Sequence, residues 1–369
     1  ETKKGGCFVV DYVYPFSHEY GICQIGDLLN VDLDRFKLGK HQNFKAYSPR
    51  DLLFLDIETR GLMETGSEVI QIGLAYFEKD AFVVRCLFAR DLNEEGAMLA
   101  DLESLLERYP LLVTFNGKSF DLRFLDGRAI MNRMFFDKGD LVEQPHIDLL
   151  PFARRVWRHL PSVALSQLDK HVLEVKRPID EIPGWRIPII YNHYLLDRNP
   201  YPIKGIFEHN RFDMLAMVGL MVEIDRLFEK GADLADPHLL LNLALHWERE
   251  GASPNAELLF NALINNEAFP GDIRFAAFRS LSLIYKRANR RSEAIRLWQS
   301  MADLSVNDIF PHIELAKHYE WHSSNPDRIK EASTWAAYAY QLAITHQPFN
   351  IQLHREIEHR LTRLASKER

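Results

Sequence analysis

The 369-residue sequence is poor in cysteine, lacks long apolar runs and carries no excess of positive charge. Its three cysteines, Cys7, Cys23 and Cys86, form no Cys-x-x-Cys pair, which indicates reduced intracellular thiols rather than a disulfide framework or a zinc site. The longest apolar stretch near a helix, 214–222, is about half of the roughly 18–20 residues that a membrane span needs. We therefore expect a cytoplasmic protein without a membrane segment. The formal net charge is −7, so any nucleic-acid binding must use local basic patches.

What the sequence does contain is the composition of an ordinary globular protein, with 47% apolar and 26% charged residues. Its length predicts two or three domains. Short apolar and aromatic runs, broken by proline and glycine, indicate that 1–49 is an N-terminal arm packing on the next domain. Strand and helix patterns alternate over 50–230, which predicts an α/β domain with a mixed sheet flanked by helices. After a linker at 231–237 the strand signals stop, and 237–369 is expected to be all-α.

The helical half contains an internal repeat. After Trp247, an alanine follows nine residues later and an aromatic residue four residues after that, and the same offsets recur from Tyr285. A third copy begins at Tyr319, with an insertion before its second helix. This pattern resembles tetratricopeptide repeats closed by a capping helix at 351–363, a surface suited to a protein partner. The alternative is a generic helical bundle.

The segment Leu52–Leu62 ends an apolar run with two carboxylates one residue apart. Four consecutive apolar residues, 52–55, fit a central strand that is buried on both faces. Because side chains at i and i+2 share one face of a strand, Asp56 and Glu58 should point the same way. Two like charges on an apolar strand favour a divalent metal between them, since hard cations take carboxylate oxygens. Taken alone, the segment favours a strand that runs out into a solvated Asp-x-Glu turn, because Asp-x-Glu is a common sequence.

Two later segments supply further acidic candidates. A strand ending at Phe115 is followed by an Asn-Gly turn and a helix, whose early Asp121 should lie at the same end of the sheet. On a later helix, His209 and Asp213 are four residues apart and share one face. The ordinary pKa of histidine, about 6.5, suits His209 to the role of a general base for water. The alternatives are a first-turn acid for Asp121 and a surface pair for His209 and Asp213.

In this order, Asp56-x-Glu58, Asn116 to Asp121 and His209 to Asp213 resemble the three motifs of the DEDD 3′→5′ exonucleases, which have a ribonuclease H-like fold. The segment FNGKSFDLRFL is similar to the second exonuclease motif of proofreading polymerases. The best match is with the bacterial YprB-type ribonuclease H-like family, whose third motif has the form His-Asn-x-x-Asp. The resemblance covers 50–228, and some members of that family also carry tetratricopeptide repeats.

The resemblance implies a metal-dependent 3′→5′ exonuclease that hydrolyses single-stranded DNA or RNA. Four carboxylates would hold two Mg²⁺ or Mn²⁺ ions ~3.5–4 Å apart. His209 would orient or deprotonate the attacking water. The metal ligands implied are Asp56, Glu58, Asp121 and Asp213, and the implied substrate contacts are Asn116, Lys118, Phe120 and Arg60.

Two features depart from the family pattern. Three residues separate His209 from Asp213, whereas members with a catalytic histidine usually place four between them. Arg60 stands where small hydroxyl residues are common in this fold, and it either reaches a phosphate or partly blocks the site. Two other functions therefore stay open, a nucleic-acid-binding module of low activity and a repeat-based scaffold with a vestigial nuclease domain. In a proline-rich segment, Trp185 and Tyr191 are candidates either for base stacking or for anchoring the loop.

Overall fold

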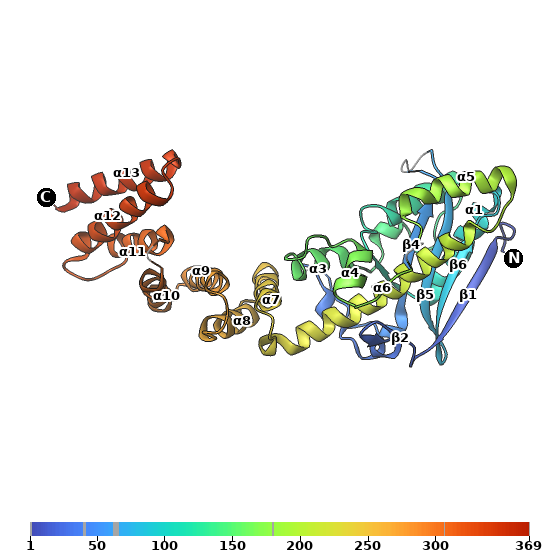
Figure 1. Ribbon diagram of the computed structural model, residues 1–369, viewed down its shortest axis with the longest axis horizontal. Helices are drawn as coiled ribbons and strands as arrows, with labels where there is room; N and C mark the ends of the chain where they lie inside the picture. The colour runs from blue at the N-terminus through green and yellow to red at the C-terminus, as the bar shows by residue number, and fades with distance from the viewer. Residues whose placement is uncertain (1, 40–41, 62–65, 179–180, 306, 369) are drawn as a thin grey trace. The chain divides into compact units, whose positions relative to one another are not determined.

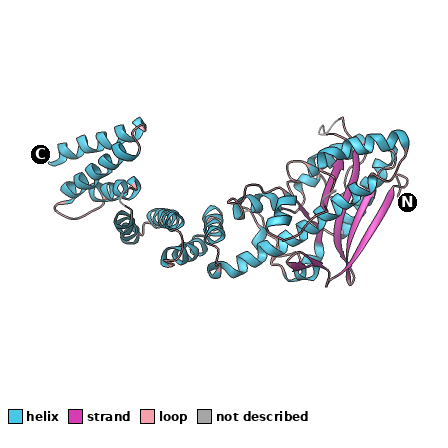
Figure 2. Ribbon diagram, in the orientation of Figure 1, coloured by secondary structure: helices cyan, strands magenta, loops and turns pink. Residues whose placement is uncertain are grey.

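The computed structural model describes residues 2–39, 42–61, 66–178, 181–305 and 307–368. The chain divides into two compact units, Glu1–Lys230 and Gly231–Arg369. Among the described residues, the first unit combines strands with helices, and the second contains helices alone (Figure 1, Figure 2). None of the described helices is both long enough and apolar enough to cross a membrane.

A six-stranded mixed sheet forms the centre of the first unit. In spatial order its strands are β1 (Phe8–Pro15), β6 (Ala81–Phe88), β5 (Val69–Glu78), β4 (Leu52–Thr59), β7 (Leu111–Thr114) and β8 (His146–Asp148). The pairs β1–β6, β6–β5 and β5–β4 are antiparallel. The pairs β4–β7 and β7–β8 are parallel. A separate antiparallel ribbon joins β2 (Glu19–Tyr20) to β3 (Cys23–Gln24).

The sheet agrees with the α/β architecture expected for this half of the chain. The strand carrying Asp56 and Glu58 is β4, a central strand as expected, and β5 and β6 form an antiparallel hairpin beside it. The residues expected to form an N-terminal arm supply β1 at an edge of the main sheet. Every residue of β1 from Phe8 to Pro15 has a partner on β6, so this part of the arm is a strand of the sheet.

Helices cover both faces of the sheet. Leu53, Leu55 and Ile57 of β4 pack in one apolar core with α1 (Glu95–Arg108) and α2 (Asp121–Met131). The opposite face is covered by α5 (Ile187–Asp197) and α6 (Ile203–Lys230), which pack on Cys86 and Phe88. Since side chains alternate along a strand, Asp56 and Glu58 point to the other face, toward α6.

Shorter helices complete the first unit. α3 (Leu149–Val156) and α4 (Leu165–His171) both pack against α6. The 3₁₀ helices of the chain are η1 (Ile25–Asn30), η2 (Leu33–Phe36), η3 (Pro49–Asp51), η4 (Leu92–Glu94), η5 (Leu141–Glu143), η6 (Gly184–Arg186) and η7 (Gly231–Asp233).

The second unit is a succession of helices, each packed against the next one along the chain. Its residues at the small repeat positions, Ala256, Ala294 and Ala332, are fully buried. Small side chains there let neighbouring helices approach closely, which is the packing that the repeated offsets predict. The helices are α7 (Pro237–Arg249), α8 (Ser253–Asn265), α9 (Gly271–Arg287), α10 (Arg291–Leu304), α11 (Ile309–Trp321), α12 (Arg328–His346) and α13 (Ile351–Glu368).

Candidate active site

The end of β4 and the middle of α6 meet over the sheet. Asn210 of α6 donates a hydrogen bond from Nδ2 to Oδ2 of Asp56, at 2.9 Å. The helix comes this close because Gly73 on β5, the register partner of Asp56, has no side chain. A Cβ built on Gly73 would lie 1.9 Å from Oδ1 of Asn210. A glycine is therefore needed at position 73 for α6 to seat its polar face on β4.

Asp121 reaches the same end of the sheet from α2, where it is the first residue. Its Oδ1 accepts a hydrogen bond from the backbone N–H of Ile57, at 3.1 Å. The turn before α2 places it there. Asn116 adopts φ 74°, and the backbone N–H of Gly117 donates to Oγ1 of Thr114. A Cβ on Gly117 would lie 2.3 Å from that oxygen, so the turn requires glycine.

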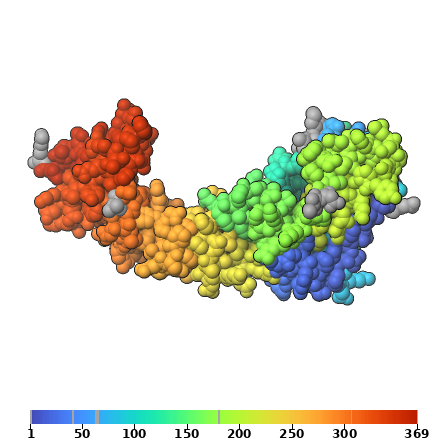
Figure 3. Space-filling view, viewed as in Figure 1, coloured from blue at the N-terminus to red at the C-terminus, as the bar shows by residue number. Residues whose placement is uncertain are grey.

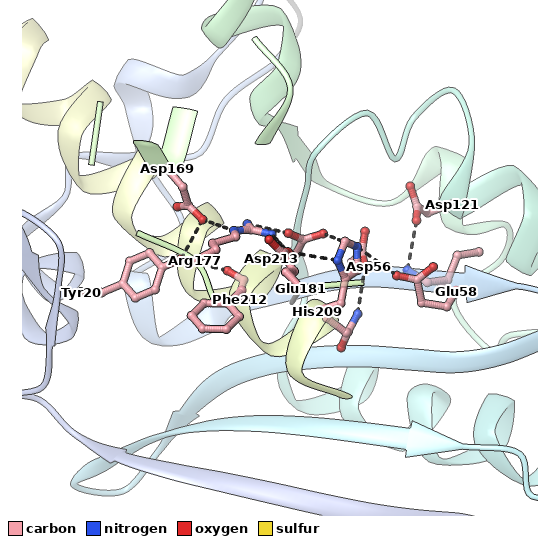
Figure 4. Close-up of polar contacts among 12 residues, drawn as sticks. Tyr20, Asp56, Glu58, Asp121, Asp169, Arg177, Glu181, His209, Phe212 and Asp213 are labelled. Atoms are coloured by element: carbon pink, nitrogen blue, oxygen red, sulfur yellow. Dashed lines mark hydrogen bonds and ion pairs between the residues drawn. The ribbon is translucent and has the colours of Figure 1, made fainter. Parts of the chain in front are cut away.

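His209 lies between the carboxylates of β4 and α6 (Figure 4). Its Nε2 is 3.6 Å from Oε1 of Glu58 and 3.4 Å from Oδ2 of Asp213. Its Nδ1 is 3.2 Å from Oε1 of Glu181, a residue of the loop before η6. The imidazole is thus oriented by Glu181 on one edge and directs its other nitrogen toward the two predicted metal ligands. The i, i+4 spacing of His209 and Asp213 is compatible with this arrangement.

Arg177 connects the site to the loop between α4 and α5. Its guanidinium contacts three acidic residues: Nε is 2.5 Å from Oδ2 of Asp169, Nη1 is 2.6 Å from Oε1 of Glu181, and Nη2 is 2.7 Å from Oδ1 of Asp213. The hydroxyl of Tyr20 also donates to Asp169, at 2.9 Å. This cluster is not predictable from periodicity, because proline-rich loops lack the repeating pattern that reveals which residues share a face. An arginine four residues before an acid in that loop was the available signal.

Burial and repulsion between like charges dominate the electrostatics of the cluster. Burial, together with the charges of Asp121, Asp213 and Glu58, raises the pKa of Asp56 well above its usual range. Burial is also the main cause that raises the pKa of Glu58 to about 8 and that of Asp121 to about 7. The ionised forms of these acids are therefore destabilised, and a bound cation would stabilise them.

The ordinary pKa assumed for His209 in the sequence analysis needs correction. Burial alone would lower the pKa of His209, but the hydrogen bond to Glu181 and the charges of Asp213 and Glu58 outweigh it and raise the pKa to about 9. These neighbouring acids therefore favour the protonated imidazole to the extent that they carry negative charge. Neutralising the carboxylates with a cation would remove part of the cause and shift the pKa back toward its ordinary value.

The four carboxylates fit a divalent metal by their chemistry. They come from β4, α2 and α6 and offer only oxygen donors, which Mg²⁺ and Mn²⁺ prefer. In the described part of the chain, however, no three acidic, histidine or cysteine side chains already stand as a metal site. Asp213 is held by Arg177 and His209, and Asp56 is held by Asn210. The side chains would have to exchange these partners for a metal.

The predicted substrate residues border the cluster. The backbone N–H groups of Asn116 and Lys118 donate to the carboxylate of Asp148, and these bonds fix the turn. The side chains of the two residues take no part in these bonds. The ring of Phe120 packs near that of Phe124, with centroids 5.5 Å apart. Arg60 is held by α5. Its Nε donates to Oδ1 of Asn192 at 2.8 Å, and its Nη1 lies 3.5 Å from Glu68.

Comparison with known proteins finds a similarity to one superfamily and to one bacterial protein. Residues 53–224 match the model of the RNase_H superfamily, which agrees with the mixed sheet and flanking helices. The chain is 29% identical over 328 residues to the uncharacterized protein YprB of Bacillus subtilis, in an alignment covering 85% of this chain and 76% of YprB. The tetratricopeptide nature of the second unit stays a prediction.

Two DNA polymerases show more limited similarity. DNA polymerase 1 of Aeropyrum pernix is 32% identical over 111 residues, which cover 24% of this chain and 12% of the polymerase. The structure of the family B DNA polymerase from the hyperthermophilic archaeon Pyrobaculum calidifontis aligns with a TM-score of 0.39 at 15% identity, over 65% of this chain and 29% of that chain. The chain therefore spans only a small part of either polymerase.

Proposed function

We propose that the chain is a metal-dependent nuclease that removes nucleotides from the 3′ end of single-stranded DNA or RNA. One observation carries the proposal. Asp121 is buried and Asp56 and Glu58 are half-buried at one end of the sheet, within the segment that matches the RNase_H superfamily, and Asp213 and His209 approach them from α6. The 3′→5′ direction is supported by the resemblance of these segments to the DEDD motifs.

The proposed metal ligands are the four carboxylates, Asp56, Glu58, Asp121 and Asp213. When bound, Mg²⁺ or Mn²⁺ would supply Lewis-acid stabilisation of the phosphate and lower the pKa of water. His209 would accept a proton from that water at Nε2, the nitrogen that faces Glu58 and Asp213. Its Nδ1 would stay paired with Glu181, which keeps the ring in one orientation.

The test is cleavage of a 5′-labelled single-stranded oligonucleotide, made once as DNA and once as RNA. The full chain is assayed with Mg²⁺, with Mn²⁺ and with EDTA, beside Asp56→Asn and Asp121→Asn. Asp303→Asn is the matched control, because this acid is exposed and lies in the helical unit. We expect a ladder of products that shortens from the 3′ end and is lost with EDTA. The cleavage rate should fall by more than about 100-fold in both site variants, since removing a metal ligand should cost more than removing a residue that only hydrogen-bonds to a ligand.

Each alternative outcome names a different function. A single internal cut would keep the metal site and contradict the exonuclease direction. Binding of the oligonucleotide without cleavage by any metal would assign the chain to the nucleic-acid-binding modules. An unchanged rate in Asp56→Asn would show that the carboxylate cluster is not the active site.

A further inference from the structure

Trp185 is a large aromatic residue that the fold leaves uncovered. Its side chain is 72% exposed, on the 3₁₀ turn η6, and no aromatic ring of the described residues packs against it. Tyr191, on the helix that follows, is fully buried and donates its hydroxyl to the carbonyl of Ala89 at 2.9 Å. Of the two aromatic candidates in this segment, Tyr191 is therefore the anchor, and Trp185 contributes little to the core.

The turn that carries Trp185 borders the carboxylate cluster. A Cβ built on the neighbouring Gly184 would lie 4.0 Å from Nε2 of His209. The turn is fixed on its other side by Ile187, which is fully buried, and by the helix α5, whose Asn192 holds Arg60 at the end of β4. In the space-filling view, α5 lies on the surface of the first unit (Figure 3). The turn that carries the exposed indole thus lies beside the proposed catalytic histidine and is anchored to the first unit by Ile187.

The chemistry of the turn suits a nucleotide. A flat, exposed indole can stack on any nucleobase, because every base presents a π face. The next residue, Arg186, is also exposed, and no carboxylate of the described residues pairs with it, so its charge is available to a phosphate. Bases within a duplex are already stacked on both sides, whereas those of a single strand are free to stack on protein.

We propose that Trp185 is a stacking site for a nucleobase of the single strand whose 3′ end lies at the carboxylate cluster, with Arg186 contacting the adjoining phosphate. The site rests on the proposed function, since it takes the position of the strand from the cluster. It makes the preference for single strands a property of this turn.

The test measures oligonucleotide binding and turnover separately. Binding is followed by fluorescence anisotropy of a labelled single-stranded DNA, in the background of Asp56→Asn so that the strand is not cut. We expect Trp185→Ala to weaken binding by roughly 5- to 100-fold, the range of base–aromatic stacking, and Trp185→Phe to retain most of it. Leu196→Ala is the matched control, because Leu196 is an equally exposed apolar residue on α5 and lies eleven positions further along. Turnover is measured in the chain that retains Asp56. There, Trp185→Ala should raise KM and leave kcat close to its original value.

The outcomes separate this inference from the proposed function. If the wild-type chain binds and cleaves the strand but Trp185→Ala binds as tightly, the stacking site is wrong and the nuclease stands. If Trp185→Ala loses single-strand binding although no metal supports cleavage, the stacking site stands and the nuclease proposal fails. Equal weakening of single-strand and duplex binding would contradict stacking, as would equal losses in Trp185→Ala and Leu196→Ala.

Discussion

At the scale of single residues, Arg177 holds the candidate active site together. One buried guanidinium contacts Asp169, Glu181 and Asp213, and Glu181 in turn orients His209. A buried cation is costly to desolvate, so the attraction of its three acidic partners has to offset that cost. Removing it would leave several buried acids without their counter-charge.

We therefore expect Arg177→Met to lower the free energy of unfolding by about 3–5 kcal/mol and to abolish cleavage, because it removes the counter-charge of the buried Asp169 and one partner each of Glu181 and Asp213. Urea unfolding of the metal-free chain measures the first effect. The double variant Asp169→Asn with Arg177→Met should recover part of the loss, since it removes one of the stranded charges. A single variant as stable as the wild type would show that the cluster contributes nothing to folding.

The acidic residues of the candidate site could be found from the sequence, whereas their support could not. Asp56 and Glu58 follow from the two-residue period of one strand, and Asp213 from the helical spacing to His209. The contact of Arg177 with Asp213 joins a loop to a helix 36 positions later, and no local pattern encodes such a pairing. The raised pKa of His209 likewise depends on three acids from different segments, which no local pattern connects.

At the scale of elements, local periodicity located strands and helices but not their partners. The later helix on which His209 and Asp213 were expected is present as α6, Ile203–Lys230, whose apolar residues recur at helical spacing over many turns. The N-terminal residues expected to form an arm include the edge strand β1. Its partner β6 begins more than sixty residues after β1 ends, and only the assembled sheet shows the pairing.

A second element-scale feature joins α11 to α13. Glu320 of α11 is buried and accepts bonds from Arg363 and Lys367 of α13, and it also contacts Arg360. Burial alone would raise the pKa of Glu320, but these three cations outweigh it and lower the pKa to about 2. The unfolded chain, in which the ordinary pKa of 4.5 applies, therefore binds this proton more readily than the folded chain.

The stability that Glu320 contributes should be fully present above pH about 4.5 and should be lost as the pH falls toward 2. We expect Glu320→Gln to cost about 1–3 kcal/mol at neutral pH and to flatten the dependence of stability on pH within that window. Urea unfolding followed by tryptophan fluorescence at a series of pH values tests this. Parallel curves for the variant and the wild type would exclude the proposed coupling of α11 to α13.

At the scale of the whole molecule, the chain divides into two compact units. The carboxylate cluster, the Arg177 contacts and the sheet all belong to Glu1–Lys230. The change from mixed to purely helical patterns predicted a linker at 231–237, and the two units divide at Gly231. Composition can locate such a change, but it carries no information on what the helical unit binds.

A chain ending at Lys230 should therefore fold by itself and unfold in one cooperative transition. We expect it to cleave a short single-stranded oligonucleotide with a kcat close to that of the full chain, because every proposed catalytic group is retained. Steady-state kinetics on both chains make the comparison. A folded but inactive fragment would show that the helical unit takes part in the chemistry.

The close approach of α6 to β5 has a consequence for how this protein can change during evolution. Gly73 and Asn210 occupy one shared space, and the amide of Asn210 holds Asp56. A larger residue at position 73 would displace the asparagine, and the carboxylate would lose its hydrogen-bond donor. The two positions should therefore be inherited as a pair. Among related sequences, those that have lost the glycine should also have lost the asparagine, and such a joint loss would mark lineages in which the catalytic geometry is no longer under selection.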